Sequence, residues 1–314
     1  MKKLLAAASM ATMCLGLMAG SAYAEDASYS VGVIFQDITN PIFAEVSEVL
    51  QTRGAEEGWE ITVLDCKSNA TEEIAQVENF IEKAVDVLVI YPVDEAALEP
   101  VCQQAADAGI KVFSWDFNLE CAEMAYLVDN YTVGKAIGEQ AANWINENYD
   151  GKCEVAVLDY ASLPVIVERA NGIIDGIKEG APEAEIVAQD SAVDAATGMT
   201  IAENMLQAHP DIKVFACIGD GGAVGANEAL KASGANLDEY GIFGCDASDE
   251  ACAAIVNNEA IRMSISLGTA AEMADKVFEC VQLMLEDGEY EKEVYKVANP
   301  INAENVEEYL ASQE

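Results

Sequence analysis

Short apolar runs alternate along this chain with longer amphipathic stretches. The first apolar runs, which are rich in Val and Ile, begin near Ser30, Glu60 and Val85. An amphipathic stretch of helical length follows each of them. This alternation is typical of βαβ units, in which helices connect parallel strands. The pattern therefore predicts an α/β fold.

The same spacing occurs a second time. A second set of apolar runs begins near Glu154, Glu185 and Ile212, and the intervals between successive starts nearly match those of the first set. Such similar intervals indicate two α/β halves in tandem. Helices are expected at residues 43–57, 71–83, 95–108, 133–148, 165–179, 198–208, 222–233 and 271–286. Further strands are expected at residues 111–115, 126–128, 241–244 and 263–267.

The first 24 residues have the pattern of a cleavable signal peptide. Lys2 and Lys3 precede an apolar stretch at residues 4–18, and small residues lead up to Ala24. The apolar stretch is shorter than the roughly 20 residues that span a bilayer, which disfavours a membrane anchor. Cys14 leaves a lipoprotein form open. We expect export to a periplasm or to the extracytoplasmic cell surface.

Charge disfavours several classes of partner. The whole chain has 16 basic and 56 acidic residues, and removal of Lys2 and Lys3 with the leader leaves a net charge near −42. Such a surface repels phosphate backbones and anionic lipid, so neither nucleic acid nor a membrane surface is an expected partner. The part of the chain after the leader is long enough for two domains.

Eight cysteines follow the leader, and their pairing stays open. An even number in an exported protein suits disulfides, but no spacing among them is diagnostic. Cys217 and Cys245 lie in apolar runs, where cysteine acts as a small core residue. Cys102 with Cys121 is the least unfavourable pair.

Little in the sequence supports catalysis. His209 is the one histidine and no Cys-x-x-Cys occurs, so neither a zinc site, nor a catalytic triad, nor any cofactor is expected. The glycine-rich run at residues 219–225 lacks the G-x-G-x-x-G spacing and is interpreted as a flexible turn beside a ligand. A carboxylate pair for glycoside hydrolysis stays open.

Polar residues gather where the expected strands end. Open parallel sheets bind ligands beyond the carboxyl ends of their strands, so these residues are candidates for a cleft. Helix capping is the alternative explanation for any single aspartate among them. The set comprises Gln36, Asp37, Asn40, Asp65, Asp94, Asp116, Asn118, Asp159, Tyr160, Asp190, Asp220, Asp246 and Ser248.

Seven motifs carry a family resemblance over nearly the whole chain after the leader. They are Gln36-Asp-Ile-Thr-Asn-Pro-Ile-Phe43, Tyr91-Pro-Val-Asp94, Val112-Phe-Ser-Trp-Asp116, Asp129-Asn130, Glu168-Arg-Ala-Asn-Gly172, Ala208-His-Pro-Asp211 and Phe243-Gly-Cys-Asp246. In this order they resemble the ribose- and galactose-type periplasmic sugar-binding proteins of ABC transporters. The resemblance implies the periplasmic binding protein type I fold, in which two Rossmann-like lobes with parallel sheets are joined by three crossovers.

The resemblance also implies the division of the chain and its partners. The first lobe would comprise residues 27–128 and 268–297, and the second residues 129–267 and 298–314, with hinges near Val128, Leu267 and Val297. The protein would be a monomer that closes on a monosaccharide or polyol and delivers it to ABC permease subunits.

Site residues follow from the resemblance where the motifs match. Asn40 would bind sugar hydroxyls through its amide, and Phe43 would stack on a ring face. Asp116 and Asp246 would accept hydrogen bonds from hydroxyl groups, and Arg169 would donate from the second lobe. Charge-assisted hydrogen bonds of this kind are stronger than neutral ones.

Four positions depart from the ribose pattern. Ile42 stands in place of an aromatic residue, Phe117 of an arginine, Gly219 or a neighbour of an asparagine, and Leu267 of a glutamine. Ribose is disfavoured as ligand for this reason, while Phe117 is a candidate stacking face. Candidate replacements for the lost polar groups are Gln36, Asp37, Tyr160 and Asp220.

Three other functions stay open beside a transport receptor. The first is a sensor module that presents a sugar or a furanosyl autoinducer to a chemoreceptor or histidine kinase. The second, the effector domain of a sugar-responsive repressor, is disfavoured by the leader and by the acidic charge. The third is an enzyme that works through carboxylates.

Overall fold

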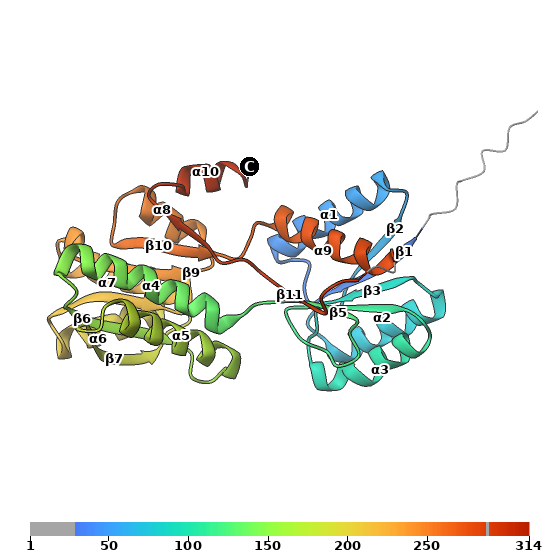
Figure 1. Ribbon diagram of the computed structural model, residues 1–314, viewed down its shortest axis with the longest axis horizontal. Coiled ribbons are helices and arrows are strands. Elements are labelled where there is room, and N and C mark those ends of the chain that lie inside the picture. Colours follow the sequence, from blue (N-terminus) through green and yellow to red (C-terminus); the bar gives the residue numbers. More distant parts are fainter. Residues whose placement is uncertain (1–28, 287–288, 314) are drawn as a thin grey trace, which may run out of the picture.

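The computed structural model describes residues 29–286 and 289–313, and the expected leader lies outside them. Two α/β lobes, each built on a six-stranded sheet, lie side by side and are joined by a narrow waist (Figure 1). This arrangement confirms the expected fold class. In the described part of the chain, no helix is long and apolar enough to cross a membrane.

The first sheet has the strand order β11-β5-β4-β3-β1-β2, and all its strands are parallel. It begins at Ser30, as expected, and Val31 pairs with both Ile61 and Val87. The bounds are β1 Ser30–Phe35, β2 Glu60–Asp65, β3 Val87–Ile90, β4 Lys111–Trp115, β5 Met124–Leu127 and β11 Glu293–Tyr295.

The second sheet repeats this topology with the order β12-β10-β9-β8-β6-β7, except that β12 is antiparallel to β10. The repeated spacing in the sequence thus corresponds to two sheets of one design. The bounds are β6 Glu154–Asp159, β7 Glu185–Ser191, β8 Ile212–Cys217, β9 Gly241–Cys245, β10 Ile261–Ser266 and β12 Asn299–Asn302.

Helices cover both faces of each sheet. In the first lobe, α1 and α9 cover one face and α2 and α3 the other. In the second lobe, α4 and α5 lie opposite α6, α7, α8 and α10. The bounds are α1 Pro41–Glu56, α2 Ala70–Lys83, α3 Glu95–Asp107, α4 Asn130–Tyr149, α5 Pro164–Gly180, α6 Ala195–Ala208, α7 Asp220–Ser233, α8 Asp249–Val256, α9 Ala270–Leu285 and α10 Val306–Ala311, with a 3-10 turn η1 at Leu237–Glu239.

Alternation along the strands builds a core on each side of the sheet. Val31, Val33 and Phe35 of β1 point to the core under α1 and α9, whereas Ile34 points to the core under α2 and α3. The same strand is buried on both faces, which explains its continuous apolar run.

The chain passes between the two sheets three times. Residues 128–129 lead from β5 to α4, residues 267–269 from β10 to α9, and residues 296–298 from β11 to β12. These three segments form the waist between the lobes. The first and third segments start side by side, because the N–H of Lys296 donates to the carbonyl of Leu127 at 2.8 Å.

One interpretation from the sequence is wrong, that of the glycine-rich run as a flexible turn. Only Gly219 precedes the helix, and residues 220–225 form the first turns of α7. The glycines serve close packing, since a Cβ on Gly225 would lie 2.5 Å from the carbonyl oxygen of Ala195 on α6. The run therefore holds two helices together.

All eight described cysteines are free thiols in this structure, and six of them are buried. Cys217 and Cys245 belong to the second-lobe cores, as their apolar runs indicate. Cys102 lies in a core cluster of the first lobe, and Cys121 packs against that cluster.

Candidate functional site

A cleft of about 750 Å³ opens between the lobes. Its lining includes Tyr91, Asp116 and Phe117 from the carboxyl ends of the first sheet, and Arg169 from α5 of the second lobe. Lys296 on the third crossing segment also lines it. Of the eight site residues expected from the sequence, which are Gln36, Asn40, Phe43, Asp116, Phe117, Arg169, Asp220 and Asp246, the lining contains Asp116, Phe117 and Arg169.

Aromatic rings form the first-lobe side of the cleft. The ring of Tyr91 contacts Phe117 edge-on, with centroids 5.7 Å apart, and Phe43 at 5.0 Å. Phe43 in turn stacks on the buried Phe35 at 5.0 Å. Aromatic faces of this kind pack against the C–H faces of a sugar ring or a cyclic polyol. Phe43 therefore belongs to the same aromatic cluster as Tyr91, although it is not part of the cleft lining.

Asp116 carries the negative charge of this side. It follows β4 with a φ of 60°, a left-handed conformation that aspartate tolerates better than most residues. Its Oδ1 lies 2.6 Å from the Nζ of Lys296. The Tyr91 hydroxyl is also bonded to it, and burial, followed by the charge of Asp116, raises the pKa of that hydroxyl. Asp116 is thus fixed and its charge is balanced.

Arg169 carries the positive charge of the second-lobe side and is 7% exposed. Its Nε and Nη2 donate to Oδ1 of Asn130 at 3.0 and 2.7 Å, and Nη1 donates to the carbonyl of Ile218 at 2.8 Å. A guanidinium has five N–H donors, so these three bonds leave two. Because its partners are neutral, Arg169 keeps both its charge and free donors.

Close packing of α4 against α5 sets the position of Arg169. A Cβ on Gly134 would lie 1.9 Å from the carbonyl oxygen of Arg169, and a Cβ on Gly172 would lie 2.1 Å from the carbonyl oxygen of Tyr131. Only glycine allows the two helix backbones to approach this closely. The helix that carries Arg169 is therefore locked to its neighbour.

Asp246 lies after β9, outside the cleft lining, and is exposed. Its φ is 112°, a strained conformation for a residue with a side chain. Desolvation of its carboxyl by the surrounding protein raises the pKa of Asp246, and the positive charge of Arg169 lowers it. Asp246 is thus within the electrostatic reach of Arg169.

Asp220 is 3% exposed and already has its partners. Its Oδ2 accepts from the N–H and the hydroxyl of Ser248 at 2.7 and 2.9 Å, and its Oδ1 accepts from the hydroxyl of Ser264 at 2.6 Å. Burial raises the pKa of Asp220 to about 7. Its contacts hold the loop that carries Asp246.

The polar residues after β1 serve the turn into α1. Asn40 is the N-cap, and its Oδ1 accepts from the N–H of Ile42 at 3.2 Å. Asp37 accepts from the N–H and hydroxyl of Thr39 at 2.9 and 2.6 Å. Gln36 donates to the carbonyl of Pro92. Asn40 is exposed, which leaves its amide N–H groups accessible at the strand ends.

A family model described as periplasmic binding protein domain matches residues 31–289. The chain belongs to this family. It is 26% identical over 251 residues to the ribose import binding protein of Bacillus subtilis (strain 168), with 79% of each chain covered. It is 25% identical over 257 residues to the galactofuranose-binding protein of Escherichia coli (strain K12), with 78% of each covered. The family resemblance inferred from the motifs is confirmed.

Solved structures share the fold of this periplasmic binding protein. An ABC transporter solute binding protein from Actinobacillus succinogenes 130z, with bound D-allose, has a TM-score of 0.74 at 21% identity and covers 90% of this chain and 100% of its own. One from Bacillus halodurans C-125, with bound myo-inositol, has a TM-score of 0.71 at 24% identity and covers 91% of this chain and 99% of its own.

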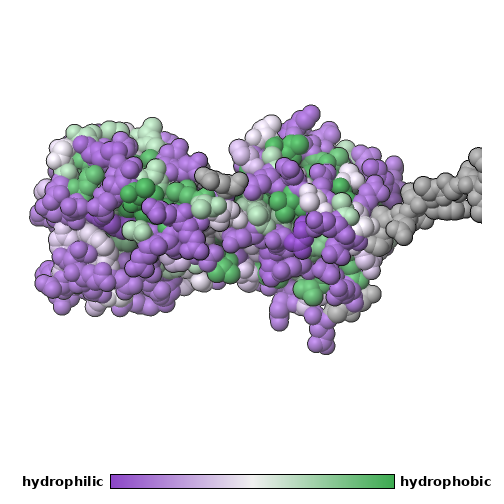
Figure 2. Space-filling model, turned by 90° about the horizontal axis from the view of Figure 1, so that it is seen from above, coloured by the Kyte–Doolittle hydropathy of each residue, from purple (hydrophilic) through white to green (hydrophobic). Residues whose placement is uncertain are grey.

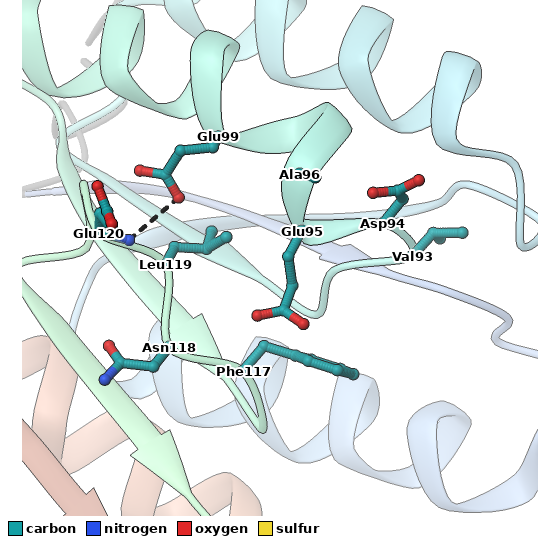
Figure 3. Close-up of a pocket in the computed structure, with 9 residues that line it drawn as sticks. All are labelled: Val93, Asp94, Glu95, Ala96, Glu99, Phe117, Asn118, Leu119 and Glu120. Atoms are coloured by element: carbon teal, nitrogen blue, oxygen red, sulfur yellow. Dashed lines mark hydrogen bonds between the residues drawn. The ribbon is translucent and has the colours of Figure 1, made fainter. Parts of the chain in front are cut away.

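A second, acidic hollow adjoins the cleft of this periplasmic binding protein (Figure 3). Its volume is about 600 Å³, and Glu95, Phe117 and Asn118 line both spaces. Glu99 points toward the loop that carries Leu119, and it accepts from the N–H groups of Glu120 and Cys121 at 3.0 and 2.7 Å. The hollow is thus a side extension of the first-lobe wall.

Three residues of the cleft escape prediction from the sequence. Tyr91 and Asn130 fall inside the family motifs, but nothing in the motifs assigns them a role. Lys296 lies outside the motifs altogether. A signal for Lys296 does exist, because it is one of only 16 basic residues and lies next to the expected hinge at Val297.

Proposed function

We propose that this protein is the exported solute receptor of an ABC importer and that it binds a monosaccharide or polyol between its lobes. The observation that carries the proposal is the cleft itself. It brings aromatic rings and a charge-balanced Asp116 on one lobe opposite Arg169 on the other. Hydroxyl-rich neutral ligands suit such a lining, since a hydrogen bond between a charged side chain and a hydroxyl is stronger than one between two neutral groups.

The family and its relatives support the same conclusion. Family members named here are binding proteins, and those with ligands hold D-allose and myo-inositol. A receptor of this kind works in the periplasm or an equivalent compartment and has permease subunits as its partner. It binds its solute and performs no reaction on it.

Hinge closure is the proposed mechanism. Residues 27–128 with 268–297, and residues 129–267 with 298–314, would move as two bodies about the three crossing segments. A ligand that contacts both lobes stabilises the closed state over the open one by its extra contacts there. Within this scheme Asn40, Phe43, Asp116 and Phe117 bind from the first lobe, and Arg169 and Asp246 bind from the second. Gln36 and Asp220 act by holding the neighbouring loops.

A thermal-shift screen of the exported chain tests this function. The panel contains pentoses, hexoses, deoxy sugars, polyols, nucleosides and amino acids. A ligand at a hundred times its dissociation constant adds about 2.7 kcal/mol to the native state, which gives a clear rise in Tm. A shift with a sugar or polyol supports the proposal. Shifts with nucleosides or amino acids alone would overturn the ligand class.

A further inference from the structure

Lys296 is the first residue after β11, and it starts the third crossing of the chain between the lobes. Its backbone N–H is bonded to Leu127 next to the first crossing. Its side chain does not extend into solvent, as lysine normally does, but is only 6% exposed and lines the cleft. A lysine is thus buried at the pivot of the molecule.

Three groups hold the Lys296 ammonium in place. Asp116 provides a carboxylate oxygen at 2.6 Å. The rings of Trp115 and Tyr126 lie beside the ammonium, with their centroids 5.8 and 5.5 Å from Nζ. A carboxylate and two aromatic faces together compensate a buried cation for its lost hydration. The ammonium therefore has a defined position beside the cleft.

The pair presents a donor next to an acceptor. An ammonium has three N–H donors, and the contact with Asp116 uses one of them. The carboxylate of Asp116 has about four lone-pair sites, so it can still accept after its contacts with Lys296 and the Tyr91 hydroxyl. A ligand anion would be repelled by Asp116 and a ligand cation by Lys296. Neighbouring hydroxyl groups satisfy both members at once, because each hydroxyl can accept and donate.

We propose that Lys296 is a ligand-binding residue of the cleft. Its ammonium donates to one hydroxyl oxygen of a vicinal diol, and the adjacent hydroxyl of that diol donates to Asp116. Recognition then takes place at the first residue of a segment that crosses between the lobes. This inference rests on the proposed function and adds a neutral diol as the feature that the first lobe selects.

A purely structural role predicts different behaviour. If Lys296 only balances the charge of Asp116, its replacement perturbs Asp116 and weakens all related ligands by a similar factor. If Lys296 binds one hydroxyl, its replacement has no further effect on the analogue that lacks this hydroxyl. A double-mutant cycle, in which the protein variant and the deoxy ligand are combined and the binding free energies are compared, separates these roles.

The experiment measures affinities by isothermal titration calorimetry. The probes are D-ribose, D-allose, D-galactose, L-arabinose and myo-inositol, followed by the monodeoxy analogues of the strongest binder. The proteins are the wild type, Lys296→Met and, as control, Lys276→Met. Lys276 lies on α9, where its ammonium pairs with exposed Glu279. Methionine preserves the contact with the two aromatic rings, and Lys296→Gln is measured instead if Lys296→Met does not fold.

We expect Lys296→Met to weaken the strongest probe by about ten- to a hundredfold, the usual effect of one charged hydrogen bond, and Lys276→Met to leave it unchanged. One monodeoxy analogue is expected to bind both proteins equally. An unchanged affinity in Lys296→Met, or an equal loss for every analogue, would overturn the role of Lys296 while the receptor function stands. If no probe binds the wild type, the sugar or polyol function falls, and this inference with it.

Discussion

The two sides of the cleft differ in whether their charged side chain is paired with an opposite charge. On the first lobe, Asp116 is in direct contact with Lys296, so that side is balanced before any ligand arrives. On the second lobe, Arg169 is held by an amide and a carbonyl, and its charge stays available. The first side is therefore arranged for shape and hydroxyl pattern, and the second for strong electrostatic attraction. On the face that Figure 2 shows, hydrophilic residues predominate on both lobes, with smaller hydrophobic patches between them.

The support behind each side differs as well. Glycines bring α4 and α5 into backbone contact under Arg169. Behind Asp116 the support comes from rings, as Trp115 packs on Phe35 at 5.6 Å and near Tyr126 at 6.0 Å. The position of Arg169 therefore depends on close backbone packing, and that of Asp116 on side-chain packing. Mutations at glycines should disturb the first, and mutations at aromatic residues the second.

The largest effect is expected from Gly134→Ala. The new methyl group would lie 1.9 Å from the carbonyl oxygen of Arg169, so α4 and α5 must separate. We expect a loss of about 3 kcal/mol in the free energy of unfolding and a weaker ligand affinity. Urea unfolding measures the first and calorimetry the second. Asn143→Ala, at an exposed position of the same helix, is the control; it should leave the affinity unchanged and raise the stability by no more than about 0.7 kcal/mol, because alanine is the better helix former. If Gly134→Ala were as stable as the wild type, the close backbone contact between α4 and α5 would not be needed for stability.

Arg169→Ala and Asp246→Ala test the available charge of the second side. Each is expected to weaken sugar or polyol binding about ten- to a hundredfold, from the usual strength of a charged hydrogen bond. Calorimetry with the strongest ligand of the screen measures the effect. Lys178→Ala, an exposed cation on the same helix as Arg169, should bind as the wild type does. Unchanged affinity in both site variants would remove them from the site.

Each lobe also contains a buried carboxyl group, Glu73 in the first lobe and Asp220 in the second. Burial raises the pKa of each to about 7. Asp220 accepts three hydrogen bonds, whereas Glu73 accepts one, from the N–H of Val93 at 3.0 Å. The folded state holds the Glu73 proton more tightly than the unfolded chain does. The contribution of Glu73 to stability is therefore fully present at low pH and falls as the pH rises from about 4.5 to 7.

Glu73→Gln removes that ionisation. We expect the variant to be about 1 to 2 kcal/mol more stable than the wild type at pH 8, with the difference vanishing at pH 4. Urea unfolding at the two pH values measures it. Glu78→Gln, on the exposed side of α2, should show no such pH-dependent difference. If Glu73→Gln and the wild type were equally stable at pH 8, burial of the ionised Glu73 carboxylate would not destabilise the folded state.

The smallest effect concerns two exposed apolar side chains, one in each lobe, that follow the carboxyl ends of strands. Ile38 follows β1 and is 39% exposed, and Leu163 follows β6 and is 42% exposed. If closure buries these side chains, Ile38→Ser and Leu163→Ser should each weaken binding about two- to fivefold without changing the stability of the open form. Calorimetry measures the change, and Val256→Ser, at the end of α8, is the control. If Ile38→Ser and Leu163→Ser both bound with wild-type affinity, closure would not bury these two side chains.

The fold can be predicted from the sequence because local patterns agree with it. Apolar runs spaced by one helix length indicate both sheets, and Gly58 and Gly234 at the expected helix ends have φ of 73° and 72°. The short strands β11 and β12 escape prediction, since so few residues carry no periodic signal. The glycine run of α7 misleads because the sequence does not show which helix packs against it.

The site is predictable only in part. Asp116, Phe117 and Arg169 lie in or next to motifs that the family shares, and they do line the cleft. Lys296 escapes prediction because its partner Asp116 is far away in the sequence, and only the pairing of β11 with β5 in the first sheet brings the two together. The roles of the site residues and the lobe boundaries stay predictions.

Small-angle X-ray scattering of the protein with and without its ligand is the decisive test of hinge closure. We expect a saturating sugar or polyol to reduce the radius of gyration, because the lobes close over the cleft. The same comparison with Arg169→Ala, at the same ligand concentration, should show a smaller reduction. A ligand that saturates the wild type by calorimetry yet leaves its scattering curve unchanged would contradict binding by hinge closure.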